Sequence, residues 1–547
     1  MTIKASKLNV SHWLSYKTAR IFLTAQPQKY QPLELDIARN ETVSFQAAFK
    51  LSDGMLPQEF TAQAEGPKGW NVRVRRVGHV PVRHRNTGME NCTELDIENG
   101  GAIPGYVPDV LFDDVTTIVP EGETHTYWIT ATPAAKTAPG NYKITVTLLP
   151  KDGSPIAMIA KVTVHNVLLK PRKDFNITHW FYADSLLDWY RLKPFEERFW
   201  EIAENYIRDY AQHGLDTLYV PAFTPPLDGV KRPTQLINVK KLGKEKWSLD
   251  WTQVDRWITL AKSAGITHFE WVHPFTQWGV KFAIRIYEGH GEDEKLLWPV
   301  ETGACSALYR KFLTQYCNEL HKFLKKHDIL EASFFHVSDE PHGADDRANY
   351  IAARKMLLEI APWMKTMDAL SEIEYGRTHL TDMPVPSISI ACDYAKENIT
   401  SWCYYCCGPR GPFLNRMLDT PLAKIAMHGF LFYRWPFKGF LHWGFNYWFR
   451  SQTRELIDIY EAQDGLRWPG WAYGDTTQVY PGPDGTPFDS IRWEVFSESL
   501  QDYRLLQTLK IDRNSPLLKK LVSFKDFPKN ADWLRKAKKQ LLEMNDK

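Results

Sequence analysis

The stretch SFFHVSDEPHG, residues 333–343, joins a short apolar run to two adjacent carboxylates and a proline. The run SFFHV has the length and composition of a buried strand, and Asp339 and Glu340 stand where it ends. Two neighbouring carboxylates oppose each other's ionisation, so their placement at a strand end is unusual. Two interpretations are open at this point: a solvated loop start, or an acid pair with a chemical function.

Short apolar strands of this kind recur after residue 175 and alternate with helical stretches, which predicts βα units and a parallel sheet. The predicted strands are NITHWFYAD (176–184), DTLYVPA (216–222), THFEWVHP (267–274), ASFFHVS (332–338), KTMDAL (365–370), SISIACD (387–393), SWCYYCC (401–407) and GFLHWGF (439–445). Eight strands is the number that a (β/α)8 TIM barrel needs, so we predict a closed α/β barrel over residues 171–512.

Three helical stretches fit between or after these strands. Residues 194–214 end in a glycine stop, and residues 307–327 carry an apolar stripe with basic residues in the last turn. The stretch SIRWEVFSESLQDYRLLQTL (490–509) predicts a helix that closes the ring. Residues 513–547 predict a basic, amphipathic C-terminal helical appendage whose lysines form a solvated face.

The N-terminal third has a different rhythm, with apolar and polar residues alternating at a period of two. Segments of this kind are ETVSFQAAF (41–49), WNVRVRRVGHVPV (70–82), THTYWITATP (124–133), NYKITVTLLP (141–150) and IAMIAKVTVHNVLL (156–169). Turn signals such as APGN and KDGSP separate them, which is typical of an antiparallel β-sandwich. We predict an accessory sandwich over residues 1–170, with the boundary at KPRKD (170–174).

The composition limits the partners. The 67 basic and 65 acidic residues of this 547-residue chain leave a net charge of +2, without the basic block that tracks a phosphate backbone, so we expect no nucleic-acid partner. The start MTIKASKLNVSHWL lacks the apolar run of a secretion signal, and no stretch is apolar enough to cross a bilayer. We therefore expect a cytoplasmic protein without a membrane partner, and the seven cysteines suit a reducing compartment.

In the predicted barrel, Asp339 and Glu340 follow the fourth strand, at the face where barrel enzymes keep their chemistry. Adjacent strand residues point to opposite faces, so both acids reach one ligand only if the chain turns there. Pro341 biases Glu340 away from the helical region and ends the strand. The apolar wall and the neighbouring charge predict that one of the two acids holds a proton near neutral pH, as a general acid requires.

Strand seven, which ends in CYYCCGPRG (403–411), contains no Asp or Glu. Many barrel glycosidases place a carboxylate nucleophile there, opposite an acid after strand four. The exception is substrate assistance, in which the 2-acetamido oxygen of the sugar attacks the anomeric carbon. Two adjacent acids fit that chemistry, one as the acid and one as an orienting carboxylate.

Five motifs in order carry a family resemblance: HVSDEP (336–341), CYYCCGPRGPFLNR (403–416), KGFLHWGFNYW (438–448), GDTTQVYPGPDG (474–485) and SIRWEVFSESLQDYRLL (490–506). Together they resemble the catalytic domain of glycoside hydrolase family 123, the β-N-acetylgalactosaminidases, over residues 170–510, and the preceding sandwich is similar to that family's N-terminal domain. The resemblance implies a retaining, substrate-assisted hydrolysis of terminal β-linked N-acetylgalactosamine, with a carbohydrate substrate and with no metal or cofactor.

The resemblance also implies roles for individual residues. Glu340 corresponds to the general acid and base, and Asp339 to the carboxylate that orients the acetamido group. Tyr404 is a candidate donor to the acetamido oxygen, Trp443 a candidate wall behind the sugar ring, and Asn446 a candidate ligand of a hydroxyl. Asp184 and Asp393, at the ends of strands one and six, are further candidates for hydroxyl binding, with capping or an ion pair as the alternative for each.

Other interpretations of the same residues stay open. His336, Asp339, Glu340 and His342 carry metal-binding groups, but their spacing does not match an HExxH helix. Cys403 and Cys406 form a CxxC that we interpret as strand packing, and Glu270 inside strand three predicts an internal ion pair. Trp180, Trp271, Trp278 and His179 lie near strand ends, where they either line a pocket or pack.

The alternatives in function are a carbohydrate-binding barrel protein without catalysis and a glycosidase for a different sugar. The sequence alone does not indicate galacto or gluco preference, the leaving group, exo or endo action, the oligomeric state, or whether the sandwich binds sugar.

Overall fold

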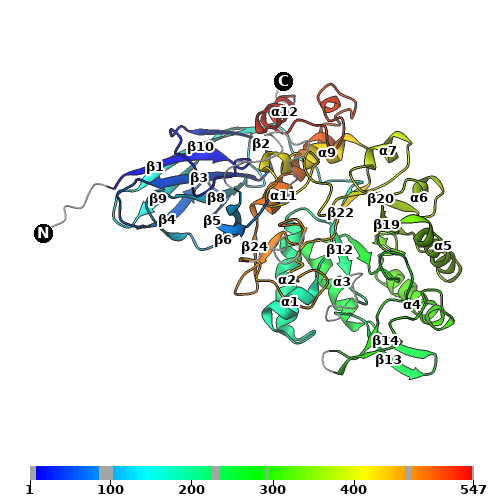
Figure 1. The fold of residues 1–547 in the computed structure, drawn as a ribbon. Coiled ribbons are helices and arrows are strands. Elements are labelled where there is room, and N and C mark those ends of the chain that lie inside the picture. Colours follow the sequence, from blue (N-terminus) through cyan, green and yellow to red (C-terminus); the bar gives the residue numbers. More distant parts are fainter. Residues whose placement is uncertain (1–7, 86–102, 225–233, 291–292, 462–470, 545–547) are drawn as a thin grey trace.

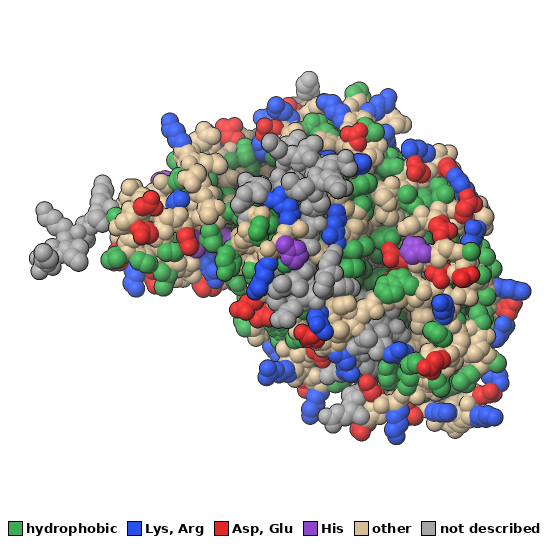
Figure 2. All heavy atoms as spheres, in the orientation of Figure 1, with side chains coloured by type: hydrophobic (Ala, Val, Ile, Leu, Met, Phe, Trp, Pro, Cys, Tyr) green, Lys and Arg blue, Asp and Glu red, His purple; other side chains and the backbone are tan. Residues whose placement is uncertain are grey.

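The computed structural model describes residues 8–85, 103–224, 234–290, 293–461 and 471–544. A sheet-rich N-terminal part lies at one end of the molecule, and the larger α/β part lies at the other (Figure 1). On the face drawn in Figure 2, acidic and basic side chains are interspersed, with hydrophobic side chains between them. Among the described residues, no helix combines the length and the apolar character needed to cross a membrane.

The N-terminal part consists of two five-stranded sheets, ordered β1-β3-β8-β5-β6 and β2-β10-β9-β4-β7. Neighbouring strands pair antiparallel, except that β10 and β2 run parallel. The bounds are β1 (Val10–Tyr16), β2 (Leu33–Ala38), β3 (Val43–Leu51), β4 (Gln58–Glu65), β5 (Asn71–Val82), β6 (Gly105–Phe112), β7 (Thr116–Val119), β8 (Thr124–Thr132), β9 (Gly140–Pro150) and β10 (Ile156–His165).

The alternation of apolar and polar residues at a period of two explains how these two sheets pack together. Alternate residues of β3, such as Phe45 and Phe49, share one buried cluster with Ile144 of β9 and Val162 of β10. The two sheets therefore bury a common apolar core between them.

The α/β part is built on a six-stranded parallel sheet, ordered β18-β15-β12-β11-β22-β21. Its strands are β11 (Asn176–His179), β12 (Thr217–Val220), β15 (His268–Trp271), β18 (Ser333–Phe334), β21 (Cys403–Tyr404) and β22 (Gly439–His442). A four-stranded sheet contains β13 (Asn238–Gly243), β14 (Lys246–Asp250), β16 (Tyr287–Glu288) and β17 (Lys295–Leu296). One two-stranded sheet contains β19 (Met367–Leu370) and β20 (Met383–Pro386), and another contains β23 (Val479–Pro481) and β24 (Pro487–Asp489).

Most helices lie around the sheet of the α/β part, whereas α12 lies beside β2 of the N-terminal part (Figure 1). They are α1 (Ala183–Tyr190), α2 (Glu197–Gln212), α3 (Thr252–Ala264), α4 (Ala307–Lys326), α5 (Gly343–Ile360), α6 (Glu374–Arg377), α7 (Ala391–Lys396), α8 (Leu422–Ile425), α9 (His428–Arg434), α11 (Ile491–Thr508) and α12 (Ala531–Glu543), with the 3₁₀ turn η3 (Leu518–Lys520). The three predicted helices correspond to α2, α4 and α11.

The predicted closed (β/α)8 TIM barrel is wrong, because the parallel strands form a curled half-barrel. The continuous sheet has six strands, and β19 and β20 make a separate two-stranded sheet. Single bridges at Phe335–Thr366 and Ser387–Tyr404 and a few backbone hydrogen bonds, such as that from the Trp402 N–H to the Pro384 carbonyl at 3.0 Å, link the two sheets in place of continuous ladders. Strands of two residues, such as β18 and β21, are too short to extend the ladder around a full ring.

The strand predicted at 387–393 is also wrong. The structure places the sixth strand, β20, at Met383–Pro386, and α7 begins at Ala391. Pro384 and Pro386 obscured it, because proline inside a run argues against a strand. Here β20 lies at the edge of its own two-stranded sheet, where proline is tolerated.

The N-terminal sheets and the α/β part share buried charge pairs. Arg75 of β5 pairs with Asp489 and, at 2.6 Å, with Oε1 of Glu494 in α11. Arg492 of α11 lies 3.0 Å from Oδ2 of Asp109 in β6, and both side chains are fully buried. Breaking such a pair leaves an uncompensated buried charge, so these contacts hold the two parts in one arrangement.

The C-terminal helix α12 does not present all its lysines to solvent. Lys538 pairs with Glu41 and lies 3.3 Å from Oδ1 of Asp502. The interpretation of these lysines as a solvated face is therefore wrong for Lys538, which ties α12 to the N-terminal sheets and to α11.

Candidate active site

Asp339 and Glu340 follow β18, and the chain turns between them. Glu340 adopts a φ of +44°, a left-handed conformation that is rare outside glycine. Its N–H donates to the carbonyl of Ala369, in β19, at 3.0 Å. This turn frees the two adjacent side chains from strand alternation, and both line one cavity.

The cavity that contains the acid pair is mostly aromatic and apolar. Its described lining contains two carboxylates, those of Asp339 and Glu340. The lining residues are Trp180, Gln277, Trp278, Asp339, Glu340, Ala369, Tyr404, Cys406, Leu441, Trp443, Gln452 and Trp471. Indole faces with a few polar groups are what a sugar-binding pocket requires.

Asp339 is the acid whose pKa is perturbed. Burial raises the pKa of its carboxyl well above the usual range, and the charge of Glu340 raises it further. The His336 imidazolium opposes this shift. No described side chain hydrogen-bonds the Asp339 carboxyl, so that group is available to a ligand. This shift favours a proton on Asp339, the member of the pair to which the resemblance does not assign the role of general acid.

Tyr404 contacts the other acid. Its hydroxyl donates a hydrogen bond to Oε1 of Glu340. Burial and the Glu340 charge raise the pKa of Tyr404 well above its usual value, so the phenol stays protonated and acts as a donor. Tyr404 thus contacts Glu340 and lines the same cavity.

A buried carboxylate fixes two tryptophans of the wall. Asp475 accepts hydrogen bonds from Nε1 of Trp443 at 2.8 Å and from Nε1 of Trp471 at 2.9 Å. The two rings stand at 88° with centroids 5.8 Å apart. His442 approaches the same carboxylate at 3.2 Å. The orientation of both indoles therefore depends on Asp475.

A charged network lies beneath Asp339. His336 Nε2 contacts Oε1 of Glu270 at 2.8 Å, and its Nδ1 lies 3.5 Å from Oδ1 of Asp368. Burial lowers the pKa of His336, but Asp368 and Glu270 outweigh it and raise the value to about 9. Glu270 also accepts from Nε1 of Trp180 at 2.7 Å. The predicted internal ion pair of Glu270 is confirmed, and it orients a tryptophan of the cavity.

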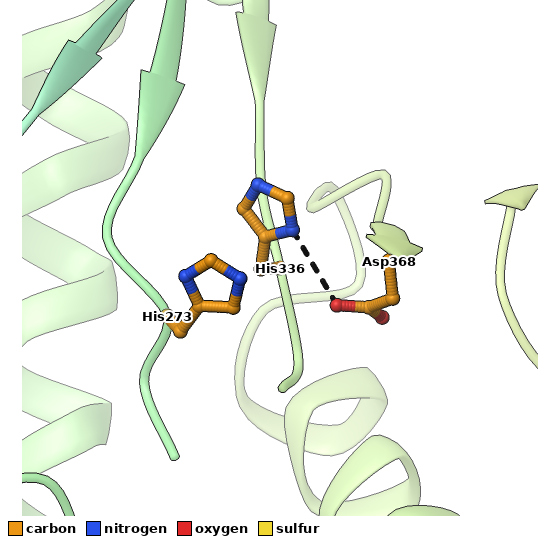
Figure 3. Close-up of side chains that lie close together, drawn as sticks. All are labelled: His273, His336 and Asp368. Atoms are coloured by element: carbon orange, nitrogen blue, oxygen red, sulfur yellow. Dashed lines mark ion pairs between the residues drawn. The ribbon is translucent and has the colours of Figure 1, made fainter. Parts of the chain in front are cut away.

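Figure 3 shows His273, His336 and Asp368 side by side, with the ion pair between the last two. One ligand atom from each lies within 4.8 Å of the others, a spacing compatible with a metal ion. The imidazoles are stacked, however, with centroids 3.9 Å apart and planes at 17°. Lone pairs in nearly parallel ring planes do not converge on one ion, and the charged His336 is not a ligand. We therefore assign the cluster to the charged network.

The four residues considered as metal ligands in the sequence, His336, Asp339, Glu340 and His342, do not form one cluster. His336 faces Glu270 and Asp368, whereas His342 is exposed at the start of α5, where its N–H donates to Asp346 at 3.0 Å. Of the CxxC pair, Cys403 is buried in β21 as expected, and Cys406 lines the cavity.

Three further candidates lie outside the cavity lining. Asn446 is buried, and its amide oxygen and nitrogen bind the backbone N–H and carbonyl of Tyr182 at 2.8 and 3.1 Å. Asp184 is buried in the first turn of α1. Asp393 lies in α7, is largely exposed, and pairs with Lys396 at 2.8 Å. The structure brings Asp339, Glu340, Tyr404 and Trp443 together and leaves these three apart.

Sequence reasoning missed Asp475, Gln277, Gln452 and Trp471. Asp475 belongs to the motif GDTTQVYPGPDG, which could have indicated it, but nothing local connects it to Trp443. The other three lie on irregular segments without a strand or helix pattern. Trp180 and Trp278, left open between lining and packing, line the cavity, whereas Trp271 packs and donates to Ser333 at 3.1 Å.

Comparison with protein families gives one match. The model "Glycoside hydrolase 123, catalytic domain" matches residues 180–509, more than half of the chain. No curated protein matches the chain.

Among solved structures, a family 123 glycoside hydrolase from Clostridium perfringens, described in connection with glycolipid glycan hydrolysis, matches with a TM-score of 0.71. It has 13% identity, and the match covers 94% of this chain and 90% of that one. A β-galacturonidase from Eisenbergiella tayi has a TM-score of 0.34 at 9% identity, with 90% and 73% covered. A termite-gut xylanase has a TM-score of 0.33 at 9% identity, with 69% and 90% covered. At 13% identity, the similarity to the family 123 structure demonstrates a shared fold.

Proposed function

The chain belongs to glycoside hydrolase family 123 and is a glycosidase acting on a carbohydrate, and we propose that it cleaves terminal β-linked N-acetylgalactosamine by a retaining, substrate-assisted mechanism. The observation that carries this proposal is the described lining of the cavity. Its two carboxylates are adjacent in sequence, so the described lining offers no separate nucleophile across the sugar from the acid.

In the first step, the 2-acetamido oxygen of the sugar attacks the anomeric carbon. The bond from that carbon to the leaving oxygen breaks, and Glu340 donates its proton to this oxygen. Asp339 accepts a hydrogen bond from the acetamido N–H and stabilises the positive charge of the oxazolinium intermediate. In the free site burial and the Glu340 charge favour a proton on Asp339. In the proposed mechanism this proton passes to Glu340 when the acetamido N–H and the developing positive charge stabilise the Asp339 carboxylate.

In the second step, water attacks the anomeric carbon from the side the leaving group has vacated. The Glu340 carboxylate accepts a proton from this water, and the carbon–oxygen bond of the oxazolinium ring breaks to restore the acetamido group. Two inversions give net retention of configuration. The hydroxyl of Tyr404, beside Glu340, supports a role as donor to the acetamido oxygen.

The test is a side-by-side assay on chromogenic β-N-acetylgalactosaminide, β-N-acetylglucosaminide and plain β-galactoside, repeated with Asp339→Asn and Glu340→Gln. Cleavage of the first substrate alone, lost in both variants, is the expected result. Cleavage of the plain galactoside at a comparable rate would refute acetamido assistance. Binding of sugar without turnover in the wild type would favour the carbohydrate-binding alternative.

A further inference from the structure

Asp368 is a fully buried residue of β19 that does not belong to the described lining of the catalytic cavity. Its Oδ1 accepts hydrogen bonds from the backbone N–H groups of Val337 at 2.9 Å and Ser338 at 3.1 Å. These two residues directly precede Asp339 and Glu340 in the chain. One side-chain oxygen therefore holds the backbone from which both acids project.

The backbone needs this acceptor because residues 335–340, the acid segment, leave the β ladder. The carbonyl of Phe335 accepts from the N–H of Met367 at 2.6 Å, and the N–H of Glu340 donates to the carbonyl of Ala369 at 3.0 Å. Between these bonds the acid segment advances from residue 335 to 340, whereas β19 advances only from 367 to 369. The segment therefore bulges, and its inner N–H groups lose their ladder carbonyls. Buried N–H groups without an acceptor are costly, and Oδ1 of Asp368 satisfies two of them.

The Asp368 carboxylate is itself fixed in place. The hydroxyl of Tyr350, in α5, donates to its Oδ2 at 2.5 Å. Nδ1 of His336 lies 3.5 Å from its Oδ1 (Figure 3). Both oxygens thus have partners, and a side chain locked in this way holds a catalytic segment more precisely than a mobile one.

The conformation that these hydrogen bonds support is strained. Glu340 has a φ of +44°, and such a conformation persists only where the surrounding structure enforces it. Without the bonds to Val337 and Ser338, the acid segment could relax toward a regular strand. Alternation along a strand would then turn the side chains of Asp339 and Glu340 to opposite faces.

We propose that Asp368 is a positioning residue for the hydrolysis, which holds the acid segment in the turn that brings Asp339 and Glu340 into one cavity. It acts through the place of its oxygen and not through its charge, and it does not touch the substrate. The inference rests on the proposed function in taking these two acids as the catalytic pair. A displacement of about 1 Å in a catalytic group lowers a rate by about 10²-fold.

The test compares three replacements of Asp368. Asp368→Asn keeps an oxygen at the place of Oδ1, and its amide nitrogen donates to the hydroxyl oxygen of Tyr350, so kcat should fall by less than about tenfold. Asp368→Ala removes the acceptor, and Asp368→Glu keeps the charge but moves the oxygens by one methylene group. Both should lower kcat by about 10²-fold with a much smaller change in KM.

Chemical denaturation separates this role from a merely structural one. Asp368→Asn and Asp368→Ala both remove the negative charge beside His336, so both should lower the stability. A loss of stability that the two variants share does not explain a large loss of kcat found in only one of them.

Asp382→Ala is the matched control. Its Oδ2 accepts from the N–H of Thr366 at 2.7 Å and from Nη2 of Arg354 at 2.7 Å, so it also binds backbone beside β19. Among the described residues, its hydrogen bonds do not reach the acid segment. This variant should lose stability and keep kcat within about twofold.

A lower kcat for Asp368→Asn than for Asp368→Glu would overturn the proposal, because charge would then matter more than position. A wild-type kcat in Asp368→Ala would overturn it as well. If Asp368→Ala does not fold, the order of the Asn and Glu variants decides. If the wild type cleaves only the plain β-galactoside, the proposed function fails, and the same order measured on that substrate still decides the role of Asp368.

Discussion

The hydroxyl of Tyr404 donates a hydrogen bond to Oε1 of Glu340 across the open side of the curled sheet. Tyr404 ends β21 and Glu340 follows β18, the two edge strands of the six-stranded sheet. The curl therefore brings residues from opposite sheet edges into one site. In the proposed mechanism, this contact holds the acid next to the leaving oxygen that it protonates.

Replacement of Glu340 by Gln should lower kcat for a disaccharide with terminal β-linked N-acetylgalactosamine by about 10²- to 10⁴-fold, because general acid catalysis is lost. The loss should be much smaller for N-acetylgalactosaminyl β-fluoride, because departure of fluoride needs less proton donation. Steady-state kinetics on both substrates check this. Equal losses on the two would contradict the assignment of Glu340 as the acid.

Replacement of Tyr404 by Phe removes the donor to Glu340 and should lower kcat/KM by about 10- to 100-fold, the effect of a hydrogen bond to a charged group. Tyr405→Phe is the matched control, since the hydroxyl of Tyr405 contacts His428 at 2.7 Å, away from the cavity lining. Activity unchanged in Tyr404→Phe would remove that residue from the mechanism.

Replacement of Asp475 by Asn should loosen the wall formed by Trp443 and Trp471, since its charged acceptor for both indoles is lost. We expect KM to rise by about tenfold or more with a smaller change in kcat, because Asp475 acts through the indoles. The intrinsic fluorescence should change as well. A fall in kcat at constant KM would show that Asp475 acts on the chemistry directly.

The charge on His336 should make stability depend on pH. The pKa of this imidazole is raised from 6.5 to about 9 on folding, so its contribution of about 3 kcal/mol is complete below pH 6.5 and is lost as the pH rises through 9. His336→Gln should therefore destabilise the protein most at pH 6 and least above pH 9. The groups that face it are Glu270, Asp368, His273 and Asp339.

Chemical denaturation of wild type and His336→Gln at several pH values measures this difference. Subtracting the two curves removes the titration of distant groups. A difference that stays constant from pH 6 to pH 10 would mean that the imidazole is neutral in the folded protein.

The local features of the site could be predicted from the sequence. Asp339 and Glu340 stand at the end of an apolar run, and Tyr404 and Trp443 stand at the ends of other runs. Parallel strands point their carboxyl ends to one side of the sheet, and the curl of the sheet then brings the residues from its two edges together. The period of two likewise indicated the N-terminal strands β3, β5, β8, β9 and β10.

The long-range features could not be predicted. The number of strands does not determine which of them pair, and the two prolines of β20 hid that strand. Asp475 meets Trp443 only because the segment after β22 folds back over the strand ends. The ion pair of Lys538 could not be predicted either, since its partner Glu41 lies 497 residues away in the sequence.

The central claim is that the substrate's own acetamido group is the nucleophile. The most direct measurement is kcat/KM for aryl β-N-acetylgalactosaminides whose acetyl group carries no, one, two or three fluorines. Fluorine weakens the acetamido oxygen as a nucleophile, so we predict a steep and progressive fall in kcat/KM along the series. Rates that do not depend on fluorine would contradict substrate assistance and require a nucleophile from the protein.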